Sequence, residues 1–186
     1  MPNTATLPRR RGWTYADYCR IRADGKRHEI IDGRHYAAPA PEPSHQAIVM
    51  RLGKRLHTRI EDGKLGLVFL SPIDVHLGPG SLVQPDILAL LPSQDALVGE
   101  KKITGVPSLL IEVLSPTPSS QRRDRRTKLR RYERAGVAEY LIVDPRARTI
   151  EQFVLRDGKY LPPRRCTEGL ELVTFPGVEI ALREIW

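Results

Sequence analysis

Two continuous apolar runs in the middle of the chain each carry a single carboxylate. The first run, residues 82–91, contains Asp86, and the second, residues 109–114, contains Glu112. Runs of this length that are rich in Ile, Leu and Val are typical of strands buried on both faces of a sheet. An ionised carboxylate there costs on the order of several kcal/mol unless a partner compensates its charge. The pattern therefore predicts two buried strands with positive charge beside them.

Helical periodicity appears in three other segments, each bounded by residues that favour helix ends. We expect helices at residues 15–23, capped by Thr14; at 45–61, capped by Ser44; and at 119–135, capped by Ser119 or Ser120 and ended by Gly136. In the third helix Asp124, Lys128 and Tyr132 share one stripe, and because Tyr132 faces the core, Lys128 is expected near the sheet.

The remaining strand-like pieces are short. We expect them at residues 28–38 as a hairpin turning at Asp32-Gly33, and at 65–70, 73–77, 140–144, 150–155, after Gly158, 170–175 and 178–182. Mixed strands and helices predict an α/β (α+β) fold. The chain shows no internal repeat, so we expect one domain over residues 14–186, preceded by a flexible basic arm at residues 1–13.

Composition excludes several classes of protein. The 186 residues suit one domain with a real core. No apolar run approaches the roughly 20 residues that span a bilayer, and the first residues lack the apolar core of a signal peptide. We therefore expect a cytoplasmic protein without membrane contact. Cys19 and Cys166 lie far apart, which supports neither a disulfide framework nor a cysteine-rich zinc site.

A net charge of +8 favours a polyanionic partner, nucleic acid first. The expected helix at 119–135 concentrates this charge, and the candidates for nucleic-acid binding are Arg122, Arg123, Arg125, Arg126 and Arg130. The alternative is that excess arginine only keeps the protein in solution, with the helix presenting an ordinary solvated face.

The two strand carboxylates suggest metal chemistry. Mg²⁺ prefers oxygen ligands and is usually held by one or two carboxylates plus substrate phosphate. Asp86 and Glu112 would supply these ligands, the carbonyl of Val113 could add another, and Mn²⁺ is a possible substitute. Lys128 would position water or stabilise charge in the transition state. Each residue alone has a simpler explanation: a strand carboxylate can pair with a buried arginine or cap a helix, and Lys128 can be solvated or form a surface pair with Asp124.

The order of these features resembles the PD-(D/E)xK nuclease superfamily and, more closely, the Uma family of endonucleases. The matching pieces are HEIIDG at 28–33, PEPSHQAI at 41–48, VQPDILAL at 83–90, PSLLIEVLSPTP at 107–118 and DRRTKLRRYERAGVAEYLIVDP at 124–145. The resemblance implies a restriction-endonuclease-like αβββαβ core, a mixed β-sheet flanked by helices, with Asp86 and Glu112 as ligands of a divalent metal. The position two after Glu112 is Leu114 rather than lysine, and the resemblance moves that lysine to Lys128.

The resemblance also points to Glu29 as a further catalytic acid and to His45 near the mouth of the site, with Asp124 at its edge. A histidine at a helix start is more commonly a capping or packing residue, so both roles stay open for His45.

These observations predict a Mg²⁺-dependent endonuclease that hydrolyses DNA phosphodiester bonds. A homodimer would suit the cutting of two strands. The alternative is a catalytically inactive nucleic-acid-binding module of the same fold acting with a partner protein, and a third hypothesis is a structural dimer. No aromatic platform or base-reading motif in the sequence separates DNA from RNA or indicates a cleavage sequence.

Overall fold

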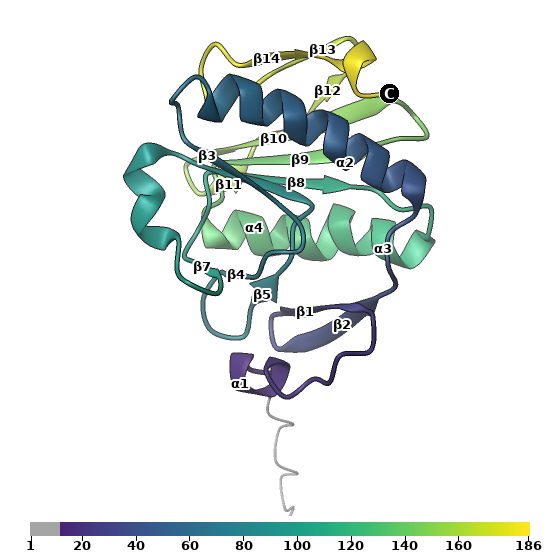
Figure 1. The fold of residues 1–186 in the computed structure, drawn as a ribbon, viewed down its shortest axis with the longest axis vertical. Helices are drawn as coiled ribbons and strands as arrows, with labels where there is room; N and C mark the ends of the chain where they lie inside the picture. Colours follow the sequence, from purple (N-terminus) through teal and green to yellow (C-terminus); the bar gives the residue numbers. More distant parts are fainter. Residues whose placement is uncertain (1–11) are drawn as a thin grey trace, which may run out of the picture.

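The structure is a computed structural model that describes residues 12–186, so the arm expected at residues 1–13 lies outside the described residues except for Gly12 and Trp13. A seven-stranded mixed sheet forms the centre of the molecule (Figure 1). Its order is β11 (Lys159–Tyr160), β10 (Thr149–Arg156), β9 (Glu139–Asp144), β8 (Leu109–Val113), β6 (Ile87–Leu90) and β3 (Leu67–Leu70), with β12 (Arg164–Cys166) also paired to β10. Strands β8 and β9 are parallel, and the other pairs are antiparallel.

Helices cover both faces of this sheet. Helix α2 (Pro43–Leu56), extended by the π-helical turn η1 (His57–Glu61), lies on one face, and a continuous helical stretch of α3 (Pro118–Arg122), the π-helical turn η3 (Arg123–Lys128) and α4 (Leu129–Ala135) lies on the other (Figure 1). The order α2-β3-β6-β8-α3/α4-β9 confirms the expected αβββαβ core.

The two long helices agree with the sequence in extent but differ in their caps. Ser44 is not the cap of α2: the N-cap is Glu42, and Pro43 occupies the first turn, where its missing N–H costs no hydrogen bond. In α3 the N-cap is Thr117 rather than Ser119 or Ser120, and Pro118 occupies the first turn. The expected end at Gly136 is confirmed, because that glycine adopts a left-handed φ of 88°.

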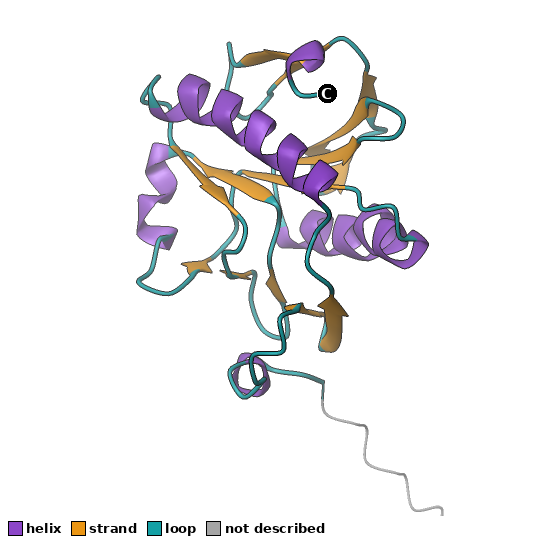
Figure 2. Ribbon diagram, turned by 45° about the vertical axis from the view of Figure 1, so that its right-hand side comes forward, coloured by secondary structure: helices purple, strands orange, loops and turns teal. Residues whose placement is uncertain are grey.

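A second, five-stranded sheet lies below α4, on the side away from the central sheet (Figures 1 and 2). Its order is β2 (Arg34–Ala38), β1 (Arg27–Ile31), β5 (Leu82–Val83), β4 (Val75–His76) and β7 (Ile103–Thr104). The β1–β2 hairpin turns at Asp32 and Gly33, both with positive φ, as the sequence indicates.

Smaller elements complete the fold. They are α1 (Tyr15–Tyr18), η2 (Pro92–Leu97), the pair β13 (Gly169–Glu171) and β14 (Glu179–Ala181), and η4 (Leu182–Glu184). Thr14 caps α1 as expected, but the helix is shorter than the predicted residues 15–23. None of the helices within residues 12–186 is long and apolar enough to cross a lipid bilayer.

The prediction of one strand over residues 82–91 is wrong. The run divides into β5 and β6, which belong to different sheets, and Pro85 lies between them. Proline has no N–H for a strand ladder, so the pairing breaks there and the chain crosses from one sheet to the other. Asp86 therefore sits at this crossing, directly before β6, rather than in the middle of a strand.

Strand alternation places both carboxylates on the same face of the central sheet. Ile87 and Ile111 pair across β6 and β8 and pack with α2. Leu88 and Leu110, the next pair, pack with Tyr132 on the opposite face. Asp86 and Glu112 continue this second alternation, so they face the α3–α4 side.

The fold makes a direct prediction for α2, where Leu52 is fully buried and Met50 is 63% exposed. Leu52→Ala should lower the free energy of unfolding by about 2–5 kcal/mol, because it leaves a cavity between helix and sheet. Met50→Ala, on the same helix, should change it by less than about 0.5 kcal/mol. Urea unfolding followed by circular dichroism measures both, and equal effects of the two variants would contradict this packing.

Candidate active site

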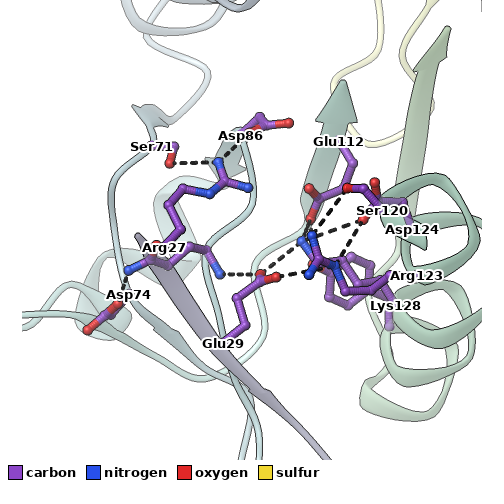
Figure 3. A network of polar contacts seen from close by, with 12 residues as sticks. Arg27, Glu29, Ser71, Asp74, Asp86, Glu112, Ser120, Arg123, Asp124 and Lys128 are labelled. Carbon is purple, nitrogen blue, oxygen red and sulfur yellow. Dashed lines mark hydrogen bonds and ion pairs between the residues drawn. The ribbon is translucent and has the colours of Figure 1, made fainter. Parts of the chain in front are cut away.

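A buried ammonium group joins three acidic side chains below the central sheet. Lys128, which is fully buried, places Nζ 2.7 Å from Glu112 Oε1 and 2.8 Å from Glu29 Oε1. Asp124, one helical turn earlier, lies 3.8 Å away. Tyr132 donates a second hydrogen bond to Glu112 Oε1 at 2.8 Å. Figure 3 shows Lys128 pointing from its helix toward the strand that carries Glu112.

Strand β1, strand β8 and the helical stretch of η3 and α4 bring these groups together. On η3 and α4, Asp124, Lys128 and Tyr132 follow one another at four-residue steps, and all three are buried. This confirms that Lys128 faces the sheet. Within the π-helical turn η3, the backbone carbonyl of Asp124 accepts a hydrogen bond from the Tyr140 hydroxyl at 3.2 Å. π-Helical turns are frequent at functional sites.

Asp86 is held by a separate set of donors. Arg27 donates to its Oδ1 at 2.7 Å. Its Oδ2 lies 2.8 Å from the backbone N–H of Val113 and 3.1 Å from His45 Nε2. The same His45 nitrogen lies 2.9 Å from the carbonyl oxygen of Val113. One nitrogen therefore contacts two of the three oxygens that the sequence suggested as metal ligands.

Charge and burial divide the carboxylates into two groups. Burial opposes ionisation of Asp86, but the hydrogen bond from His45 and the charge of Arg27 hold its pKa well below its ordinary value. Burial also opposes ionisation of Glu29, and Lys128 and Arg123 outweigh it, so the pKa of Glu29 is lowered. Both groups are ionised at neutral pH.

Glu112 and Asp124 behave in the opposite way. Burial raises the pKa of Glu112 to about 8, against the opposing charge of Lys128 and with a contribution from Asp124. Burial likewise raises the pKa of Asp124 to about 6, although Lys128 and Arg123 oppose the shift. One ammonium shared among several carboxylates cannot fully compensate all of them, so part of the cluster retains protons near neutral pH.

A cavity of about 320 Å³ opens onto this cluster. Its polar floor includes Asp86, Glu112 and Asp124. Its walls include Arg27, the Ala- and Pro-rich segment 36–42, His45, Val113, residues 115–117, Ser119, Ser120 and Arg123. Lys128 is not among the described residues that line it. It lies behind Glu112 and contacts the cavity only through its carboxylate partners.

The oxygens at this cavity suit a hard divalent cation. Asp86 and Glu112 face it, the Val113 carbonyl lies beside Asp86, and Asp124 Oδ1 is buried without a hydrogen-bond partner among the described residues. No group of three or more His, Cys, Asp or Glu side chains within residues 12–186 is arranged to hold a metal by itself. Two carboxylates and a carbonyl, completed by water and phosphate, make up the usual oxygen environment of Mg²⁺ rather than a complete protein cage.

The arginines expected to bind nucleic acid lie in different places. Arg122 is exposed, and Arg123 lines the cavity, where it donates to Ser120. Arg125 pairs with Asp144 and Glu151 on the other side of the helix.

The other two, Arg126 and Arg130, are exposed and line a second cavity of about 720 Å³ between the helix and the β1–β2 hairpin. Arg126 and Arg130 therefore line a different cavity from the one that contains the acidic residues. The binding role of all five arginines stays a prediction.

Sequence analysis missed two residues of the site. Arg27, the partner of Asp86, precedes Glu29 by two positions on β1, so both side chains share one face of that strand. Gln84 precedes Asp86 by two positions; its backbone N–H donates to Glu29 at 2.9 Å, and its side chain donates to Asp74 at 2.8 Å. The two-residue spacing could have indicated both, but only once the hairpin was known to face the acids.

Comparison with known proteins places this geometry in context. A family model named Uma2 and described as "Putative restriction endonuclease" matches residues 14–183. A solved structure from Anabaena variabilis, described as a putative nuclease belonging to DUF820, is similar with a TM-score of 0.73 and 16% sequence identity, over 93% of this chain and 97% of that chain. No curated protein matches the chain significantly.

Removal of the buried ammonium should destabilise the protein in a pH-dependent way. In Lys128→Met, Glu29 and Glu112 lose their counter-charge, so the folded-state pKa of Glu29 rises above the unfolded value of about 4.3 and that of Glu112, already raised, rises further. The folded state then binds more protons than the unfolded state, and stability falls as pH rises. We expect a loss of about 3–5 kcal/mol at pH 8 and a smaller loss at pH 5.

Urea unfolding at the two pH values measures this difference. Lys128→Met combined with Glu112→Gln should recover part of the loss at pH 8, because one buried charge is removed with its partner. An equal loss at both pH values would show that the ammonium does not compensate the acids.

Proposed function

The chain belongs to the Uma2 family of restriction-endonuclease-like proteins, and from this premise we propose that it is a Mg²⁺-dependent endonuclease that hydrolyses DNA phosphodiester bonds. The observation that supports this proposal most strongly is the cavity whose floor brings together Asp86, Glu112 and Asp124 beside Arg27 and Arg123. Acids that can hold a cation and guanidinium groups that can contact phosphate are the two components that such a hydrolysis needs.

Asp86, Glu112 and the carbonyl of Val113 would hold the divalent ion. When bound, such an ion polarises a phosphoryl oxygen and lowers the pKa of water. His45 supports the arrangement because its Nε2 keeps the Asp86 and Val113 oxygens near one point, 3.1 and 2.9 Å from the same atom.

We assign the cationic residues different roles from their positions. Arg27 and Arg123 line the cavity, so their guanidinium groups can contact the phosphate whose charge grows in the transition state. Lys128 lies behind Glu112 and fixes Glu112 Oε1 together with Tyr132. In this arrangement Lys128 acts through Glu112, and Glu29 assists by sharing the ammonium. Direct contact of Lys128 with water or phosphate stays a prediction.

The substrate and the cellular setting follow from charge and composition. A net charge of +8 favours binding to DNA. We propose that the protein acts in the cytoplasm and that it forms a homodimer, which would present two such cavities to DNA.

One observation favours a second function, a catalytically inactive nucleic-acid-binding module that acts with a partner protein. Arg27 already compensates Asp86, and Lys128 already compensates Glu112, so the acids have protein counter-charges without a metal. Such a module would bind nucleic acid in a salt-dependent way and cut none in the presence of Mg²⁺ or Mn²⁺.

Cleavage of plasmid DNA with Mg²⁺ or Mn²⁺ tests the proposed function. Asp86→Asn and Glu112→Gln should each lower the rate at least about 100-fold, because each removes a ligand and a charge from the cavity. The matched control is Glu171→Gln, a glutamate exposed on β13, which should leave the rate unchanged. Wild-type activity in both cavity variants would refute the assignment, and addition of EDTA should abolish cleavage by the wild type.

Metal binding should strengthen with pH. Because burial raises the pKa of Glu112 to about 8 and that of Asp124 to about 6, a cation must displace protons to bind below these values. We expect the apparent affinity for Mn²⁺ to rise between pH 6 and pH 8, by at most about tenfold per pH unit for each proton released.

Isothermal titration calorimetry with Mn²⁺ alone at pH 6, 7 and 8 measures this change, and buffers of different ionisation enthalpy count the released protons. Glu112→Gln should both weaken binding and flatten the pH dependence. A wild-type affinity that stays constant over this range would contradict the protonation state described here.

A further inference from the structure

The two cavities beside the helical stretch 118–135 are neighbours with a shared wall. The first cavity contains the acidic floor, and the second lies between the helix and the β1–β2 hairpin; Tyr36 lines both. Arg34, Tyr36 and Ala38 lie at alternate positions of β2 and therefore share one face of the strand. Arg34 lines the second cavity, Tyr36 lines both cavities, and Ala38 lines the first. A path along β2 from the acids to the hairpin turn therefore passes both cavities, and we call this path the channel.

The helix forms the opposite wall with a matching series. Arg123 lines the first cavity, and Arg126, Thr127 and Arg130 line the second, at steps of three or four residues along one side of the helix. Figures 1 and 2 show the hairpin and this helical stretch lying side by side. The guanidinium group of Arg123 lies 5.9 Å from the centre of the Tyr36 ring, at the junction of the two cavities.

The charges in the second cavity are only partly compensated. Arg134 pairs with Asp32, and Lys159 with Glu133. Three further arginines line the cavity, are exposed and form no ion pair with another described residue: Arg34, Arg126 and Arg130. A row of uncompensated guanidinium groups leading away from an acidic floor is complementary to a phosphate backbone that extends from the reacting phosphate.

We propose that this channel binds an unpaired strand of DNA, with a base stacked on Tyr36 and the adjacent phosphates held by Arg34, Arg126 and Arg130. This rests on the proposed function, since it assigns the form of its substrate. A base inside a duplex has neighbours on both faces and cannot offer one to a protein ring, whereas an unpaired base can.

Binding of labelled oligonucleotides in EDTA tests this proposal without requiring cleavage. Fluorescence anisotropy compares a single-stranded DNA of about 12 nucleotides with its duplex, and the wild type should bind the single strand more tightly. Tyr36→Leu should weaken single-strand binding at least about fivefold, because base stacking is lost, and Tyr36→Phe should retain wild-type affinity. Thermal melting by circular dichroism checks that both variants are folded.

The arginines give an independent readout. Arg126→Ala combined with Arg130→Ala should weaken single-strand binding and reduce the slope of log affinity against log salt concentration by about 1.4, since each lost phosphate contact contributes about 0.7. The matched control removes the same charge from exposed arginines far from the channel in sequence, Arg165→Ala with Arg183→Ala, and should keep the wild-type slope.

Two results would overturn the inference: equal or tighter binding of the duplex, or an unchanged single-strand affinity in Tyr36→Leu. A protein that binds as expected in EDTA but fails to cut DNA with Mg²⁺ would refute the proposed hydrolysis and leave the strand channel in place. The two proposals are therefore tested separately.

Discussion

The arrangement of the site depends on compensation of negative charge in a place that water hardly reaches. Glu29, Asp86, Glu112 and Asp124 are buried together, and the cations that face them are Arg27, Arg123 and Lys128. The carboxylates outnumber these cations, which is consistent with raised pKa values for Glu112 and Asp124 and lowered pKa values for Asp86 and Glu29. A cluster with fewer cations than carboxylates is more stable when part of it is protonated, and binding of a cation would release those protons.

The need to compensate buried charge is compatible with both partners that the sequence suggested for a strand carboxylate. A carboxylate in an apolar run could have a metal or a buried arginine as its partner. Asp86 has the arginine, Arg27, and it also lies beside the Val113 carbonyl at the edge of a cavity that Glu112 shares. Protein cations make the fold tolerable without a metal, and the oxygens that face the cavity leave room for one. The contacts that stabilise the fold can therefore be separated from the oxygens that would hold a metal.

Much of the fold and part of the site could be predicted from local patterns. Periodicity located both long helices and the burial of Lys128, because a stripe that contains Tyr132 must face the sheet. The continuous apolar runs indicated Asp86 and Glu112 as site candidates, and the family resemblance indicated Glu29. The sequence could not show that Pro85 divides one apolar run between two sheets, since either half alone reads as a buried strand. It could not show Arg27 or Tyr36 at the site either, because their place depends on how the hairpin sheet packs below α4. Long-range packing decides such contacts, and no local spacing encodes it.

The π-helical turn η3 ties the register of the helix to the chemistry of the site. It holds one residue more per turn than a regular helix would, between Arg123 and Lys128. If the same residues formed an ordinary α-helix instead, the segment after η3 would be rotated by about one residue, roughly 100°, relative to the segment before it. The Lys128 ammonium and the arginines of the cavity would then no longer share a side. The irregular turn thus absorbs one extra residue and lets a single helix contact both the acidic floor and the core.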